Sequence, residues 1–98
     1  MNQGIGGSPP LFPLGDLVAT PNALNSLRNC GITPMGLIAR HGIGDWGDLP
    51  LIDVQANFDA LRRGGRLLSS YLLAGGTKVW VITEADRSMT TILLPSEY

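Results

Sequence analysis

The 98-residue chain is long enough for one small domain, and its 44% hydrophobic residues can supply a core. Seven lysines and arginines against eight aspartates and glutamates leave no excess positive charge for general binding to DNA or to an anionic membrane. One cysteine and one histidine exclude an internal disulfide and a dedicated zinc cluster. We therefore expect a cytoplasmic domain without metal, cofactor or membrane span, for which nucleic acid is an unfavoured partner.

The N-terminal segment is rich in glycine and proline, with apolar Leu11, Phe12 and Leu14 between the prolines. Proline removes backbone donors, so this segment suits neither a helix nor a central strand. It also lacks the basic start and apolar core of a signal peptide. We expect a flexible or extended arm over residues 1–15 and a single domain over 16–98, which begins with a very short strand at 17–19.

Thr-Pro pairs at 20–21 and 33–34 mark two helix starts. Threonine caps a helix with its hydroxyl, and proline at the first helical position loses no hydrogen bond. We expect these helices to end near Gly31 and Gly42, and a third helix to be capped by Asp48 or a neighbour. The third helix is predicted from apolar residues that recur every three or four positions, namely Leu51, Val54, Phe58 and Leu61.

The last third of the chain alternates between apolar and polar residues and predicts strands at 66–73, 78–85 and 89–94. Gly75-Gly76 and Asp86-Arg87 separate these strands as tight turns. The order of the elements predicts an α+β fold, with two or three helices packed on a three-stranded antiparallel β-meander at the C-terminus.

Two-residue turns would set Ser70 opposite Val81 and Val81 opposite Ile92. One face of the sheet is then apolar and faces the helices. The other face also carries large apolar side chains, although a solvent-facing sheet surface is mostly polar. A three-residue second turn would flip the third strand but keep Tyr71 beside Trp80. Either the N-terminal arm or a second protein chain should cover this face, whose candidate interface residues are Tyr71, Trp80, Ile82 and Leu93.

Polar residues gather in the segment 40–48, in which glycines surround Trp46. Binding groups often lie on loops that a rigid scaffold holds, so Asp45, Trp46 and Asp48 form a candidate binding edge. The alternative is a structural connection, in which Trp46 fills the core and Asp48 caps a helix.

A second hypothesis is a small ribonuclease. Metal-independent RNA cleavage needs a base, an acid and a cation beside the phosphate, and His41, Glu84 and either Arg66 or Arg87 are the candidates. The order of helices before a sheet is similar to that of barnase and of the ribosome-dependent toxin ribonucleases, a likeness of element order alone. The balanced charge argues against this hypothesis, and Glu84 with Arg87 is also compatible with a surface ion pair.

Three segments have a distinctive sequence: RHGIGDWGDL at 40–49, GGRLLSSYLL at 64–73 and VWVITEADRSMTTILLPSEY at 79–98. In them the chain resembles a family of small, uncharacterised proteins encoded on bacterial plasmids, integrative elements and gene cassettes. The similarity covers roughly residues 16–98. It implies a mobile-element context and a bacterial cytoplasm, and it brings no established activity. We expect an accessory protein that acts through protein contacts, as a homodimer or with another protein, rather than an enzyme. An inhibitor of a host defence enzyme is a further hypothesis.

Overall fold

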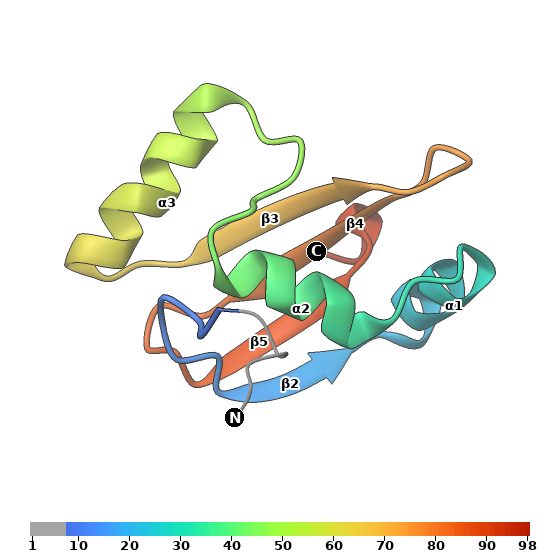
Figure 1. The fold of residues 1–98 in the computed structure, drawn as a ribbon, viewed down its shortest axis with the longest axis horizontal. Coiled ribbons are helices and arrows are strands. Elements are labelled where there is room, and N and C mark those ends of the chain that lie inside the picture. The colour runs from blue at the N-terminus through green and yellow to red at the C-terminus, as the bar shows by residue number, and fades with distance from the viewer. Residues whose placement is uncertain (1–7) are drawn as a thin grey trace.

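The computed structural model describes residues 8–98, and over these residues it has an α+β fold of three helices and a four-stranded mixed sheet (Figure 1). Residues 1–7 of the predicted arm lie outside the described residues. The helices are α1 (Pro21–Asn29), α2 (Pro34–Gly42) and α3 (Leu51–Arg63). No helix between residues 8 and 98 is long and apolar enough to cross a bilayer. The strands are β2 (Asp16–Ala19), β3 (Leu67–Leu72), β4 (Lys78–Thr83) and β5 (Met89–Leu93), and a short 3-10 turn, η1 (Pro95–Glu97), follows them.

Both helix starts predicted from Thr-Pro pairs are confirmed. The Thr20 hydroxyl accepts a hydrogen bond from the N–H of Ala23, and the Thr33 hydroxyl accepts one from Gly36, each at 3.1 Å. Each cap contributes about 1 kcal/mol to helix stability. The third helix also lies where the apolar spacing places it, but it begins without a side-chain cap. The prediction that Asp48 caps it is therefore wrong.

The prediction of a purely antiparallel three-stranded sheet is wrong at one edge. The strands β3, β4 and β5 do form an antiparallel meander, but the spatial order is β2-β5-β4-β3. The short N-terminal strand, β2, pairs in parallel with β5, with Leu17 opposite Thr90. Its pairing begins where the N–H of Asp16 donates to the carbonyl oxygen of Ser88 over 3.0 Å. The sheet is therefore mixed and joins the two ends of the chain.

The turn between β3 and β4 contains three residues, not two. The N–H of Leu73 donates to the carbonyl oxygen of Thr77 over 2.8 Å, and Ala74, Gly75 and Gly76 form the loop between them. Both glycines have positive φ angles, +90° and +95°, which residues with a Cβ rarely adopt. A three-residue loop of this kind shifts the pairing of the two strands by one residue.

This shift moves every side chain of β3 to the face opposite the predicted one. Ser69, not Ser70, lies opposite Val81, and Tyr71 lies opposite Val79. The predicted pairing of Val81 with Ile92 in the next hairpin is confirmed.

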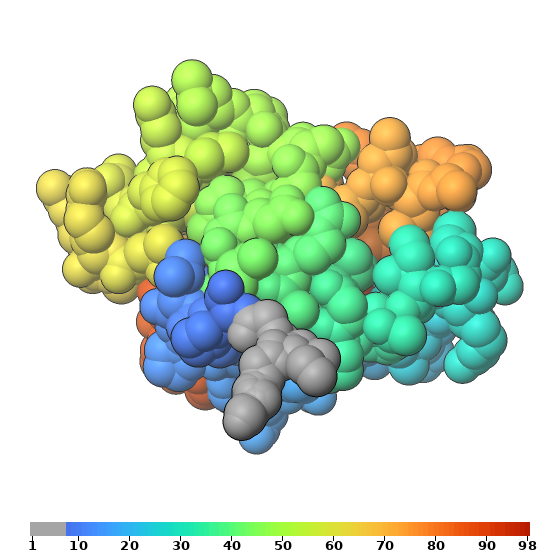
Figure 2. Space-filling view, in the orientation of Figure 1, coloured from blue at the N-terminus to red at the C-terminus, as the bar shows by residue number. Residues whose placement is uncertain are grey.

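All three helices pack against one face of the sheet, which we call the helix face. Figure 2 views the molecule from this side and has α2 at the centre, between α1, α3 and residues of the N-terminal arm. A second, smaller cluster joins Phe12 of the arm to Trp46, Ala60 and Leu67. Residues 8–15 therefore complete the core on the helix face instead of covering the opposite face. The main cluster contains Ala23, Leu27, Leu37, Ile38, Tyr71, Leu73, Val79, Val81 and Ile92.

Helix α3 buries the predicted side only in part: Val54 and Leu61 pack against the smaller core cluster, as expected, but the helix is rotated from the predicted orientation. Leu51 is 72% exposed and Phe58 is 49% exposed, whereas Asn57 and Ala60 are buried. The side-chain amide of Asn57 explains this rotation, because it donates to the carbonyl oxygen of Leu68 over 2.8 Å and accepts from the N–H of Leu68 over 3.0 Å. Asn57 thus takes the place that a neighbouring strand would occupy beside β3.

We expect Asn57→Ala to lower the free energy of unfolding by about 2 kcal/mol, because the N–H and C=O of Leu68 lose their partners. Gln55→Ala changes an exposed residue of the same helix and should shift that free energy by no more than about 0.5 kcal/mol. Urea denaturation followed by circular dichroism measures both values. Equal effects in the two variants would contradict the assigned role of Asn57.

Candidate functional site

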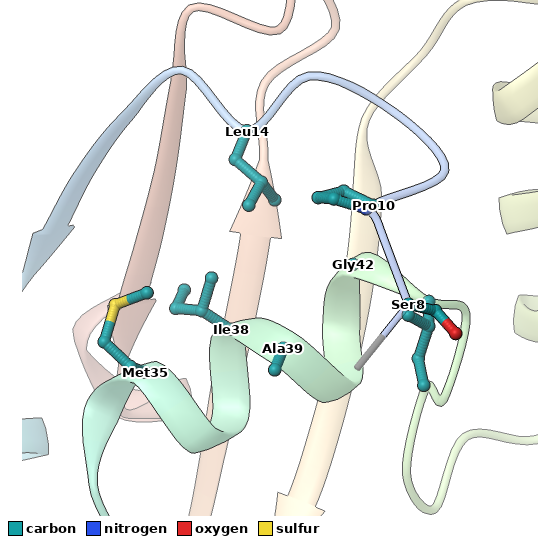
Figure 3. A pocket seen from close by; sticks show the side chains of 8 residues that line it. Ser8, Pro10, Leu14, Met35, Ile38, Ala39 and Gly42 are labelled. Atoms are coloured by element: carbon teal, nitrogen blue, oxygen red, sulfur yellow. The ribbon is translucent and has the colours of Figure 1, made fainter. Parts of the chain in front are cut away.

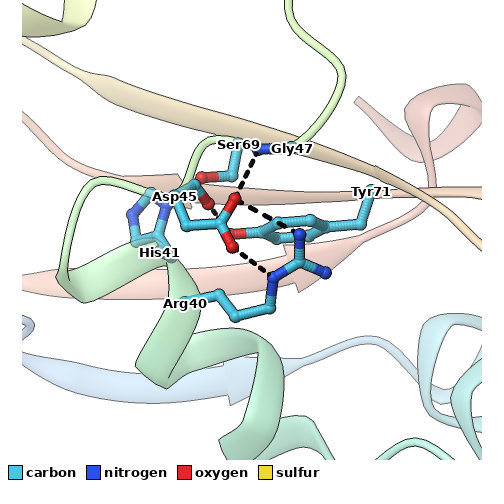
Figure 4. A network of polar contacts seen from close by, with 6 residues as sticks. All are labelled: Arg40, His41, Asp45, Gly47, Ser69 and Tyr71. Carbon is cyan, nitrogen blue, oxygen red and sulfur yellow. Dashed lines mark hydrogen bonds and ion pairs between the residues drawn. The ribbon is translucent and has the colours of Figure 1, made fainter.

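The segment 40–48 is held by internal contacts (Figure 4). The Arg40 guanidinium donates to the Asp45 carboxylate through contacts of 2.7 and 3.2 Å, and it lies 4.5 Å from the centre of the Tyr71 ring. The Tyr71 hydroxyl donates to the backbone oxygen of Asp45 over 2.7 Å. Hydrogen bonding to Arg40 lowers the pKa of Asp45, and the same contact raises the pKa of Arg40. The carboxylate that the sequence placed at a binding edge is therefore occupied by an arginine of its own segment.

The other two residues of the predicted binding edge differ: Trp46 lies inside the molecule, whereas the Asp48 side chain is exposed and pairs with a lysine. Trp46 is buried, with its ring against those of Phe12 and His41. The backbone oxygen of Trp46 accepts from the N–H of Ser70 over 3.0 Å, and the N–H of Asp48 donates to the carbonyl oxygen of Ser70 over 2.8 Å. The Asp48 carboxylate lies 3.5 Å from the Lys78 ammonium nitrogen. The segment serves to cover the outer edge of β3.

His41 lies inside the molecule and is part of a chain of hydrogen bonds. The Thr90 hydroxyl donates to the backbone oxygen of Leu14 over 2.7 Å, so it accepts from the Thr83 hydroxyl, also at 2.7 Å. Thr83 has then used its proton and accepts from Nε2–H of His41 over 2.9 Å. Nδ1 of His41 is left as the acceptor for the hydroxyl of Ser69 at 2.6 Å. The chain fixes one tautomer of a neutral imidazole.

Burial lowers the pKa of His41 to about 4, because a charged imidazolium there loses its hydration. The side chain has no exposed surface, and both ring nitrogens have partners in the core. A general base must reach the proton that it removes from a substrate. In this structure His41 cannot reach a phosphate at the surface, so the ribonuclease hypothesis loses its proposed base.

Arg87 likewise serves the fold. Its guanidinium donates to the backbone oxygens of Gly65, at 2.6 Å, and Ala60, at 3.0 Å, as well as to two oxygens of its own turn. It thereby ties the β4–β5 turn to the C-terminal end of α3. Glu84 is exposed, so the predicted trio of His41, Glu84 and Arg87 does not form one accessible site.

The face of the sheet opposite the helices, which we call the open face, carries the side chains that alternate with the helix-facing ones. Tyr71 is not among them, since its register places it on the helix face, where burial raises its pKa to about 12. The predicted pairing of Tyr71 with Trp80 at an interface is therefore wrong, whereas the other three predicted interface residues do lie here. The open face consists of Asp16, Val18, Leu68, Ser70, Leu72, Lys78, Trp80, Ile82, Met89, Thr91 and Leu93.

A groove of about 300 Å³ lies on the open face and has mainly apolar walls. The chain turns at η1 and returns over the sheet, so that the Tyr98 ring lies 5.8 Å from the Trp80 ring. The Arg66 guanidinium lies 5.2 Å from the centre of the Tyr98 ring. The groove is lined by Arg66, Leu68, Trp80, Ile82 and Tyr98.

The C-terminal segment thus covers part of the open face, which the sequence analysis assigned to the N-terminal arm or to a partner. Ile82 and Leu93 are buried, and Trp80 is half-buried. Leu72 is 59% exposed and Met89 is 38% exposed, so apolar surface continues beyond the groove. The cover is only partial.

Glu97 anchors the C-terminal segment. Its carboxylate accepts from the Thr20 hydroxyl at 2.7 Å, from the side-chain amide of Asn22 at 3.2 Å and from the N–H of Leu94 at 2.9 Å. The bond from Thr20 is the largest cause of a lowered pKa at Glu97. These bonds hold the C-terminal segment beside Tyr98, which forms one wall of the groove.

Two residues of the groove, Leu68 and Tyr98, were missed by the sequence analysis, and Arg66 was considered only as a catalytic cation. A three-residue turn at the glycine pair would have placed Leu68 beside Trp80. Tyr98 follows the last strand and has no strand signal of its own. The Gly-Gly pair was the available signal for Leu68, and none was available for Tyr98.

Comparison with protein-family models, with curated proteins and with solved structures found no match. Between residues 8 and 98, no three side chains of histidine, cysteine, aspartate or glutamate lie together as metal ligands. The groove on the open face is therefore the candidate functional site on geometry alone.

Proposed function

We propose that this protein is a non-enzymatic interaction module and that its partner protein binds the open face, with the groove at Trp80 as the anchoring point. The observation that carries this proposal is a preformed, mainly apolar groove on a sheet face that no helix of residues 8–98 covers. Sheet surfaces of small monomers that face water are mostly polar, so an apolar one favours an interface.

The residue types in the groove support this proposal. Trp, Tyr and Arg are the residues that contribute most often to binding energy at protein interfaces. The groove combines Trp80, Tyr98 and Arg66 around the apolar side chains of Leu68 and Ile82. A partner side chain that enters the groove would lose water where it contacts these walls.

The biological setting is part of the proposal and rests on the resemblance of segments 40–49, 64–73 and 79–98 to proteins of bacterial mobile elements. We place the protein among accessory proteins that such elements express in the bacterial cytoplasm. The buried position of His41 gives no support to a ribonuclease activity.

Site-specific photocrosslinking in living bacterial cells tests the proposal. A photoreactive amino acid at Leu72, which is 59% exposed on the open face, should form a covalent adduct with the partner. Trp80→Arg should reduce that adduct at least about tenfold, a loss typical of truncating an anchoring residue at an interface.

The control places the same amino acid at Ile52, which is 74% exposed on α3 and away from the open face. Ile52 should give no adduct of the same mass. Equal adducts from both positions, or an adduct at Leu72 that Trp80→Arg leaves unchanged, would refute binding through the open face.

A further inference from the structure

The two edge strands of the sheet, β3 and β2, differ in how far their outer backbone groups are covered. The outer edge of β3 is covered at Ser70 by the backbone of residues 46–48 and at Leu68 by the side-chain amide of Asn57. The strand at the other edge, β2, has β5 on one side and no strand on its other side among residues 8–98 (Figure 1). Among residues 8–98 no bonds are made by the outward backbone groups of β2, whereas those of Leu68 and Ser70 in β3 are paired.

The free groups of β2 can be assigned from its pairing. The N–H of Asp16 and that of Thr20 donate inward to β5, at 3.0 Å each. Because inward and outward groups alternate along a strand, the N–H and C=O groups of Leu17 and Ala19 point away from the sheet. Natural sheets protect such edges by keeping the edge strand short, or with charged residues, proline or a bulge. The strand β2 is short, but Asp16 is its one charged residue, and the residues with outward groups, Leu17 and Ala19, are apolar.

The side chains at this edge are also apolar and partly exposed. Leu17 is 44% exposed and Val18 is 41% exposed. On the helix face the edge continues into apolar grooves of about 100 and 180 Å³ that share Met35 and Ile38 of α2. Figure 3 shows these two side chains and Ala39 below the Leu14 and Pro10 side chains of the arm. Met35 is 59% exposed.

We propose that β2 pairs antiparallel with β2 of a second copy of this chain, about a twofold axis at Val18, and so joins two sheets into one of eight strands. The strand is self-complementary in this register. Leu17 of each copy lies opposite Ala19 of the other, so the free N–H and C=O groups of both residues are all paired.

The side chains fit the same register. A large Leu17 faces a small Ala19 on the helix face, and the two copies of Val18 meet on the open face. Asp16 lies opposite Thr20, so no carboxylate faces another directly across the interface. A different partner would need an exposed strand with complementary side chains, whereas a second copy of this chain has such a strand in its own β2.

The twofold axis is perpendicular to the joined sheet, so both open faces point to the same side. The dimer would then present two Trp80 grooves on one continuous surface. The pairing of the two β2 strands does not depend on the proposed function, but the idea of a bivalent partner site does.

Sedimentation equilibrium across a dilution series tests the pairing. The full-length chain should reach twice its monomer mass of 10.4 kDa at high concentration. Val18→Lys places two like charges directly opposite each other and should give the monomer mass at every concentration. Leu72→Lys, at an exposed position on the other edge strand, should keep the mass of the unchanged chain.

Disulfide formation provides a second measurement that does not depend on loss of the dimer. In a Cys30→Ser background, Val18→Cys places two cysteines in a non-hydrogen-bonded pair, with Cα atoms about 4.5 Å apart, which is within disulfide range. Val18→Cys should crosslink under mild oxidation, and Leu72→Cys should not.

A chain that stays monomeric at every concentration would overturn the proposal. So would a dimer that Val18→Lys leaves intact, or crosslinking at Leu72→Cys as fast as at Val18→Cys. A dimer that Trp80→Arg disrupts and Val18→Lys does not would place the self-association on the open face instead. The photocrosslinking result from Leu72 is independent of these outcomes, so failure of one proposal is distinguishable from failure of the other.

Discussion

Gly47→Ala is expected to lower the free energy of unfolding by about 4 kcal/mol. Gly47 has a φ angle of +76°, and a Cβ on it would overlap the backbone carbonyl group of Ser70. A positive φ costs a residue with a Cβ about 1–2 kcal/mol, and overpacking against atoms that cannot move costs about 1–3 kcal/mol more. The bridge between the 46–48 segment and β3 would have to open, which exposes the edge that it covers.

Gly31→Ala separates the cost of a positive φ angle from the cost of the overlap with Ser70. Gly31 also has a positive φ, +68°, but a Cβ there meets no atom within 4 Å. We expect a loss of about 1 kcal/mol for this variant, from backbone strain alone. Urea unfolding of both variants gives the comparison. A Gly47→Ala variant no less stable than Gly31→Ala would contradict the close contact between the loop and β3.

Acidification should destabilise the fold through His41. The pKa of His41 is about 4 in the folded chain and near 6.5 in the unfolded chain, so the unfolded chain binds a proton that the folded chain excludes. The stability due to the neutral ring is complete above pH 6.5 and falls as the pH drops from 6.5 to 4. The loss over this interval should be about 3 kcal/mol.

His41→Gln is the matched variant for this measurement. Its amide has an acceptor oxygen and an NH2 donor, so it can replace the imidazole's acceptor toward Ser69 and its donor toward Thr83, but it does not titrate in this range. Unfolding free energies between pH 7 and 4 should fall for the unchanged chain and stay nearly flat for His41→Gln. The carboxylates with lowered pKa values, such as Asp45, lose their contribution mainly below this interval. The same slope in both proteins would contradict the buried neutral histidine.

Local signals in the sequence predicted the helices correctly. The Thr-Pro starts of α1 and α2 act within one turn of chain, so the residues themselves contain all the information needed. The three strands of the meander were also visible from their composition. The face that α3 buries was not, because it depends on a bond from Asn57 to a strand that follows later in the chain.

The turn between β3 and β4 shows how one residue changes a predicted surface. Two consecutive glycines fit a two-residue or a three-residue loop, and the sequence pattern does not distinguish them. The three-residue loop moves Tyr71 to the helix face and brings Leu68 beside Trp80. The expected interface therefore kept Trp80, Ile82 and Leu93 but lost its second aromatic ring.

The candidate site differed most from expectation in the segment around Trp46, where His41 and Trp46 are buried and Asp45 pairs with Arg40. His41, Asp45 and Trp46 follow one another near glycines, which is typical of a functional loop. The partners of His41 are Ser69 and Thr83, which lie in strands far along the chain, and Asp45 pairs with Arg40. Sequence spacing does not reveal hydrogen bonds between residues that lie far apart in the chain. It also gave no sign of the parallel pairing of β2 with β5.

The most direct test of binding through the open face is the accessibility of Leu72→Cys to a thiol reagent, in the Cys30→Ser background. Purified protein should react rapidly, since position 72 is 59% exposed and lies away from the β2 edge. In bacterial cells that carry the partner the reaction should slow at least about tenfold, and Trp80→Arg should restore it. Equal reaction rates in cells and in purified protein would mean that the open face is free in the cell and would contradict the account.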